Sequence, residues 1–219
     1  EEIAMYGPGA DRDLYPDTDW LKEMLREHTY NMRYTLNVRG GSERARYFVS
    51  GAFYQENGIF KEGKKNEYDN NIGLKRYNLR SNIDFDATKT TLVKVDISGQ
   101  YLQTNYPGTS TNTIFNSMCR TPSYLMPAEY SDGTIAGHPR PSGNRVNPYM
   151  NSGYAKEWRT SIQSKLEVDQ KLDFITKGLN WKGLISFDAD MKYIAKRTKT
   201  PTQYLATGRD ENGGLQFKK

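Results

Sequence analysis

The most regular feature of the chain is an alternation of apolar and polar residues that begins after residue 29. In the stretch "YNMRYTLNVR", one set of alternate positions is wholly apolar: Tyr30, Met32, Tyr34, Leu36 and Val38. The intervening positions are polar and include Arg33 and Arg39. Because successive side chains of a β-strand point to opposite faces, this period of two predicts an amphipathic strand.

The same period recurs often enough to predict an antiparallel all-β meander of about six strands. The expected strands lie near residues 30–39, 45–56, 71–86, 91–105, 157–172 and 178–194, within a sheet covering residues 29–195. They are longer than the five or six residues typical of soluble strands. They also exceed the ~9 to 11 residues that a tilted strand needs to cross a bilayer.

The connections between these strands alternate in length. Residues 40–43, 87–90 and 173–178 form short turns, whereas residues 57–70 and 107–155 form long loops. In an antiparallel meander the two kinds of connection fall at opposite ends of the sheet. Short turns at one end and long loops at the other are typical of outer-membrane barrels.

The two ends of the chain carry little alternation. Residues 1–28 are predicted to be a lead-in loop with a short helix over residues 20–27, capped by Asp17, Thr18 or Asp19. Residues 196–219 are predicted to be the start of a further loop. The chain opens with two glutamates and no secretion signal, so we expect an internal piece of a longer protein.

A soluble sheet with one face on a core is the alternative to a membrane barrel. It is disfavoured because the polar faces are too charged for a sandwich interior and no helix is available to cover the apolar faces. Aromatic residues also gather near the strand ends, as in the girdles of membrane barrels. Those at the long-loop end are Tyr30, Phe53, Tyr77, Tyr101, Trp158 and Tyr193; those at the short-turn end are Phe85, Phe174 and Trp181. Six strands cannot close a barrel, so we expect them to be part of a larger wall.

Composition excludes several other classes of protein. Hydrophobic residues make up 36% of the 219 residues, and no apolar run approaches the ~20 residues of a spanning helix. The net charge of +5 is spread along the chain, and without a basic cluster we expect no nucleic-acid partner. Cys119 is the only cysteine, which excludes a disulfide framework within the chain.

Several motifs, in order, resemble those of the SusC/RagA family of TonB-dependent outer-membrane transporters of the Bacteroidota. The motifs are "YPDTDWLKEML", "YTLNVRGGSERARYFVSGAFYQENGIFKEGKKNEYDN", "RYNLRSNIDFDATKTTLVKVDISGQY" and "KLDFITKGLNWKGLISFDADMKY". The resemblance covers roughly residues 15–195, except that residues 107–155 match little in the family.

The resemblance implies a large, 22-stranded transmembrane β-barrel with an N-terminal plug domain, which is absent from this sequence. It implies short turns facing the periplasm and long loops facing the cell exterior, in the outer membrane of a Gram-negative cell. It also implies a SusD-like surface lipoprotein that lids the barrel, and a TonB complex that energises import of oligosaccharides or peptides. The sequence does not distinguish these two substrates. No chemistry on the substrate and no cofactor are implied.

The long loop 107–155 is the best candidate for contact with a substrate or with the lipoprotein lid. Its candidate residues are Phe115, Tyr124, Tyr130, Arg140, Arg145 and Tyr149. Aromatic faces can stack on sugar rings, and arginine can bind carboxylates or sulfates through two hydrogen bonds. The alternative is that these residues pack on one another.

Charged residues on the polar faces of the strands are candidates for lining the lumen. They are Arg33, Arg46, Arg76, Arg80, Lys94 and Asp96. They form either a polar transport path or a lattice of ion pairs that stabilises the wall, and the second interpretation is favoured.

Metal binding and catalysis find little support in the sequence. The carboxylates of "DRDLYPDTD" lack the spacing of an EF-hand, so turn and capping roles are expected rather than a calcium site. His28 and His138 are the only histidines and no G-x-S-x-G motif accompanies them, so we expect no enzyme. Two alternatives to a transporter remain: an outer-membrane adhesin or receptor that binds ligand without energised transport, and an enzyme embedded in a barrel.

Overall fold

The computed structural model describes residues 6–7, 9–61, 71–137, 146 and 151–218. Six strands form one sheet: β1 (Asn31–Gly41), β2 (Ala45–Asn57), β3 (Gly73–Asp86), β4 (Thr91–Pro107), β5 (Gly153–Lys171) and β6 (Asn180–Thr198). Each strand pairs antiparallel with the next in chain order, which confirms the predicted all-β antiparallel meander. Two short strands, β7 (Leu205–Arg209) and β8 (Leu215–Lys218), form a separate hairpin.

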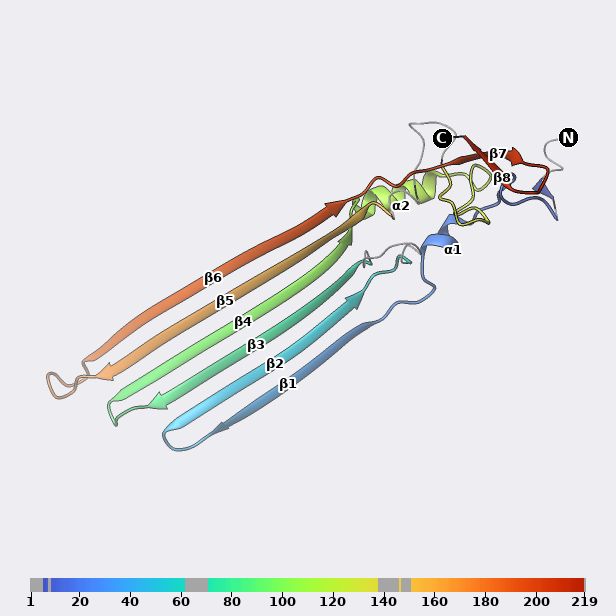
Figure 1. The fold of residues 1–219 in the computed structure, drawn as a ribbon. Helices are drawn as coiled ribbons and strands as arrows, with labels where there is room; N and C mark the ends of the chain where they lie inside the picture. Colours follow the sequence, from blue (N-terminus) through green and yellow to red (C-terminus); the bar gives the residue numbers. More distant parts are fainter. Residues whose placement is uncertain (1–5, 8, 62–70, 138–145, 147–150, 219) are drawn as a thin grey trace.

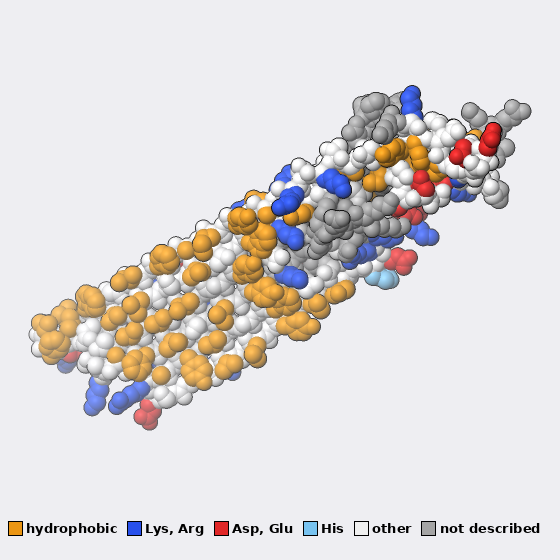
Figure 2. Space-filling view, viewed as in Figure 1, with side chains coloured by type: hydrophobic (Ala, Val, Ile, Leu, Met, Phe, Trp, Pro, Cys, Tyr) orange, Lys and Arg blue, Asp and Glu red, His pale blue; other side chains and the backbone are white. Residues whose placement is uncertain are grey.

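The six-stranded sheet is a single layer whose two faces differ in chemistry. Figure 1 shows the strands side by side, with both helices gathered at one end and neither face of the sheet covered along most of its length. The apolar face is continuous across the sheet because apolar residues of neighbouring strands pair with one another. Val38 pairs with Val49, for example, and Ile83 pairs with Val95. This apolar face is open: Leu36 is 71% exposed and Ile185 is 70% exposed. Figure 2 shows hydrophobic side chains spread over the face of the sheet turned toward the viewer.

An aromatic row crosses the apolar face near the long-loop end of the sheet. Tyr34, Phe53, Tyr77 and Tyr101 are successive partners in the register of β1 to β4, and neighbouring ring centroids lie 5.0–6.3 Å apart. Tyr30, predicted from the sequence to be among the aromatic residues at this end, precedes β1, and the row contains Tyr34 on β1. Trp158 and Tyr193 pair on β5 and β6, with centroids 5.4 Å apart.

The short turns are closed by side chains that bind backbone amides. Between β1 and β2, the Ser42 hydroxyl accepts from the amides of Arg44 and Ala45 at 3.3 and 3.2 Å. Between β5 and β6, the Gly178 amide donates to Asp173 at 2.7 Å. Gly178 has φ +83°, a conformation that side chains other than glycine rarely adopt, so this turn depends on glycine.

A compact cap with its own hydrophobic core stands at the long-loop end of the sheet (Figure 1). We define the cap as the described residues of 6–28, 58–61, 108–137, 146 and 199–218. Its buried apolar residues are Trp20, Met24, Phe60, Ile114, Met118, Met126, Tyr130, Ala136 and Val146. The partly buried Ala206, Leu215 and Phe217 pack against this core, which therefore joins segments from both ends of the chain and from the two long loops.

The two helices of more than one described residue belong to the cap. α1 (Trp20–Met24) begins after Asp19, whose side chain accepts from the Lys22 amide at 3.1 Å, so Asp19 is the cap among the three residues proposed from the sequence. α2 (Thr111–Arg120) begins after Ser110, whose side chain accepts from the Thr113 amide. No helix in the described part of the chain is long and apolar enough to cross a membrane.

Two segments predicted from the sequence to be loops contain regular elements. α2 lies inside the expected 107–155 loop, and the β7–β8 hairpin lies inside the expected 196–219 loop. β5 and β6 are also longer than predicted, since they pair over 19 residues each and extend beyond the alternating segments at the long-loop end.

Candidate functional site

The polar face of the sheet is the first candidate functional surface. All six residues predicted to line a lumen lie on it: Arg33, Arg46, Arg76, Arg80, Lys94 and Asp96. The register places polar residues opposite one another along continuous rows. In one such row Arg46 pairs with Asp84, and Asp84 pairs with Lys94.

A cluster of ion pairs centred on Glu167 occupies the short-turn half of this face. Glu167 is only 6% exposed, and its Oε1 lies 2.8 Å from Lys94 Nζ and 2.9 Å from Lys182 Nζ. Both ammonium groups also contact Asp169, at 3.0 and 3.7 Å. Because β4, β5 and β6 each contribute a member, the cluster ties three strands together. Glu167 is not among the lumen-lining residues predicted from the sequence, because its partners come from other strands, one of them 73 positions away.

Other ion pairs continue across the polar face. The Arg46 guanidinium lies 3.7 Å from Asp84 and 3.5 Å from Asp86. Arg159 donates to both carboxylate oxygens of Asp190, with its shortest contact at 2.6 Å. These pairs are about half exposed, so each contributes little to stability by itself.

Arg33 and Arg76 occupy the same row, on either side of Tyr54. The Arg76 guanidinium lies 5.2 Å from the centroid of the Tyr54 ring, in the geometry of a cation–π contact. Its Nε is buried without a hydrogen bond within the described part of the chain.

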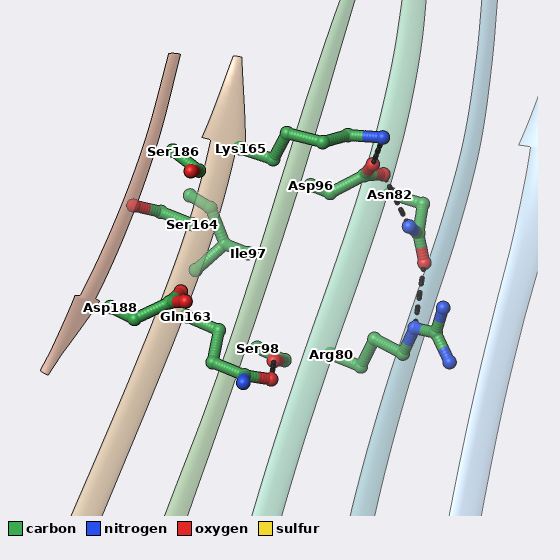
Figure 3. Close-up of a pocket in the computed structure, with 10 residues that line it drawn as sticks. All are labelled: Arg80, Asn82, Asp96, Ile97, Ser98, Gln163, Ser164, Lys165, Ser186 and Asp188. Atoms are coloured by element: carbon green, nitrogen blue, oxygen red, sulfur yellow. Dashed lines mark hydrogen bonds and ion pairs between the residues drawn. The ribbon is translucent and has the colours of Figure 1, made fainter. Parts of the chain in front are cut away.

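A hollow of about 440 Å³ opens on the polar face near the middle of the sheet (Figure 3). We call it the central hollow. Lys165 Nζ lies 3.0 Å from Asp96, and the other oxygen of Asp96 accepts from the Asn82 amide. Arg80 Nε donates to Asn82 Oδ1 at 3.1 Å. Lys165, Asp96, Asn82 and Arg80 therefore form a chain of polar contacts across β5, β4 and β3 along one side of the hollow.

The cap separates the predicted loop residues into exposed and buried groups. Phe115 is 50% exposed and Tyr124 is 58% exposed, so both rings are available to a ligand or partner. Tyr130 is 4% exposed and packs in the core, where its hydroxyl accepts from the Ala206 amide at 2.9 Å. Burial raises the pKa of this phenol. In this structure Tyr130 supports the cap instead of offering its ring to a ligand. The remaining predicted residues, Arg140, Arg145 and Tyr149, lie outside the described residues, as does His138.

The aspartates of the lead-in bind an arginine from the other end of the chain. Arg209 donates through Nε and Nη2 to the two carboxylate oxygens of Asp11, and Nη2 also reaches Asp13 at 2.7 Å. Asp13 accepts from the Ser131 amide at 2.8 Å as well. We call this group, Asp11, Asp13, Ser131 and Arg209, the clasp.

The electrostatics of the clasp are those of an ion pair. The hydrogen bonds from Arg209 hold the pKa of Asp11 below its ordinary value, and those to Asp11 raise the pKa of Arg209. No group of three or more potential metal ligands occurs among the described residues. No local sequence pattern predicts the clasp, because Asp11 and Arg209 are separated by 198 positions.

Comparisons with known proteins find structural similarity and no sequence match. No family model matches the chain, and no curated protein matches it. The solved structure of the RagAB peptide importer in its closed-closed state matches 83% of this chain with a TM-score of 0.60 and 17% identity. The open-open state of the same importer matches 83% of the chain with a TM-score of 0.59 and 18% identity. The fold is shared with part of a peptide importer.

The extent of this match limits what it shows. The chain spans about a fifth of the length of the importer chains, 20% in both cases. At this level of identity the match shows the fold alone. It agrees with the fold that the SusC/RagA resemblance implied for residues 15–195.

Proposed function

We propose that this chain forms part of the wall of a TonB-dependent outer-membrane transporter, which imports peptides or glycans together with a SusD-like surface lipoprotein. One observation carries the proposal. The sheet is a single layer whose apolar face is open along its length, while its polar face is laced with ion pairs. In a soluble protein such an apolar face would have to be covered, whereas in a barrel wall it contacts lipid.

The lengths of the strands and the aromatic row support the same arrangement. Strands of 11 to 19 residues are long enough to cross a bilayer at a tilt. The row of Tyr34, Phe53, Tyr77 and Tyr101 suits a membrane interface, where aromatic rings with polar tips are enriched. The open edges of β1 and β6 would be paired by further strands of the same barrel.

In this proposal the cap lies outside the cell, above the barrel. The short turns face the periplasm, and the exposed rings of Phe115 and Tyr124 are available to the lipoprotein or to arriving substrate. The polar face lines the lumen, and substrate passes along it without chemical change. The similarity to the RagAB peptide importer supports a transporter of this architecture.

Uptake by cells that carry or lack the complete protein tests the proposal. Radiolabelled peptides and oligosaccharides would be supplied with and without a protonophore. We expect uptake of at least one class to disappear both on deletion and on collapse of the proton gradient. Binding to the cell surface that depends on the protein, without uptake, would instead indicate an adhesin or receptor. Hydrolysis of the substrate that depends on the protein would indicate an enzyme.

A further inference from the structure

One row of the polar face has opposite charges on β3 and β6, with neutral polar groups on the two strands between them. Arg80 pairs with Ser98 in the register of β3 and β4, Ser98 pairs with Gln163 on β5, and Gln163 pairs with Asp188 on β6. All four residues line the central hollow. Figure 3 shows them following one another across the four strands, with Arg80 at one end and Asp188 at the other.

Arg80 and Asp188 make no salt bridge within the described part of the chain, unlike several charges around them. Lys165 and Asp96 pair with each other, Arg159 pairs with Asp190, and the lysines around Glu167 share its carboxylate. The two terminal nitrogens of Arg80 and the carboxylate of Asp188 make no hydrogen bond within the described part of the chain. The hollow thus offers one guanidinium and one carboxylate that are available to a ligand.

The middle of the row supplies uncharged hydrogen-bonding groups. Ser98 donates its hydroxyl to Gln163 Oε1 at 3.4 Å, which leaves the Gln163 amide nitrogen to donate elsewhere. Backbone carbonyls of a peptide can accept from such an amide. A carboxylate binds well to a guanidinium, and an ammonium binds well to a carboxylate.

We propose that this row binds short peptides with free ends, with the peptide carboxylate at Arg80 and the peptide ammonium at Asp188. The inference rests on the proposed transport function and names its substrate class. Neighbouring strands lie ~4.8 Å apart, so the backbones at the two ends of the row are about 14 Å apart. An extended chain rises ~3.3 Å per residue, so a peptide of about four residues spans that distance. A neutral oligosaccharide would leave both charges unused.

Binding of tetra-alanine to the complete transporter, purified in lipid nanodiscs, tests the assignment. Tetra-alanine with free ends would be compared by calorimetry with its N-acetylated form, its C-amidated form and a neutral oligosaccharide. We expect either blocked end to weaken binding about tenfold, because each removes a charged hydrogen bond. Arg80→Gln should remove the preference for the free carboxyl end, and Asp188→Asn should remove the preference for the free amino end. Arg80→Lys keeps the charge and should retain part of the preference.

Matched controls come from the neighbouring ion pair on the same face. Asp190→Asn and Arg159→Gln make the same chemical changes one and two rows away and should leave both preferences intact. If the Arg80 and Asp188 variants bind free and blocked peptides as the unsubstituted protein does, the assignment is wrong. Absence of tetra-alanine binding, or tighter binding of the neutral oligosaccharide, also overturns it. Proton-dependent uptake in cells would still support the transport function in those cases, whereas loss of uptake of both classes would contradict both proposals.

Discussion

A single buried hydroxyl, that of Tyr130, joins two segments of the cap that are far apart in the sequence. It accepts from the Ala206 amide at the start of the hairpin, 76 positions away. The Tyr130 ring lies 5.4 Å from the ring of Phe217 on β8, so the same side chain packs against both hairpin strands. The loop that contains Tyr130 is rich in aromatic residues and arginines, a composition typical of ligand sites. The packing role of Tyr130 becomes visible only when the position of the hairpin in three dimensions is known.

Substituting Tyr130 by phenylalanine should loosen the hairpin without emptying the core. The ring is kept, whereas the Ala206 amide loses its acceptor at a cost of about 1 kcal/mol. We expect the exchange of that amide with deuterium to accelerate by about fivefold, measured by mass spectrometry on the complete protein. Tyr124→Phe is the matched control, because Tyr124 is 58% exposed and its substitution should leave the hairpin unchanged. Equal effects of the two variants would contradict the role assigned to the Tyr130 hydroxyl.

At the scale of elements, the β7–β8 hairpin covers one side of the cap core and is tied to the lead-in by the clasp. Leu215 and Phe217 face the core, while the intervening Gln216 is exposed. Arg209 is the last residue of β7. Its guanidinium donates two hydrogen bonds to the Asp11 carboxylate and a further one to the Gly213 carbonyl, at 2.9 Å. One side chain therefore fixes both the turn of the hairpin and its attachment.

Arg209→Gln should detach the hairpin from the lead-in, because glutamine cannot form the two-pronged contact with Asp11. We expect faster deuterium exchange over residues 205–218, while the sheet keeps its protection. Arg12→Gln is a suitable control, since Arg12 is exposed and lies between the two aspartates of the clasp. Protection of the hairpin that is unchanged in Arg209→Gln would show that apolar packing alone holds it.

The clasp also has a defined pH dependence. The pKa of Asp11 is lowered in the folded protein. Its contribution to the stability of the hairpin attachment is therefore complete above the ordinary aspartate pKa, and it disappears as the pH falls through the lowered pKa. Exchange of the hairpin amides, corrected for the intrinsic rate at each pH, should therefore rise only in strong acid. In Arg209→Gln this additional rise should be absent. A loss of protection near neutral pH would contradict the assignment.

At the scale of the whole molecule, the sheet was predictable from the sequence and the cap was not. A strand can be predicted from its own residues alone, because an alternation such as that of residues 30–39 indicates both the strand and the side chains on each of its faces. α2 and the hairpin carry local signals as well: Ser110 and Thr113 at a helix start, and Asn212 before two glycines at a turn. These segments are short, however, and their burial depends on partners from distant parts of the chain. The central hollow likewise arises only when the register brings Arg80 and Asp188 into one row.

Two adjacent arginine substitutions on β1 would show which face of the sheet contacts lipid. Leu36 and Thr35 are both exposed in the sheet and lie on opposite faces, near the middle of the strand. If the apolar face contacts lipid, Leu36→Arg places a charge in the hydrocarbon just inside the aromatic row, at a cost of about 1–2 kcal/mol, between the cost at the interface and that at the midplane. Thr35→Arg would point into a watery lumen and cost little. We therefore expect a markedly reduced amount of the folded Leu36→Arg variant in the outer membrane, and a nearly normal amount of Thr35→Arg. A soluble sheet with both faces in water would tolerate both substitutions equally. The opposite order would mean that the polar face is the one turned to lipid.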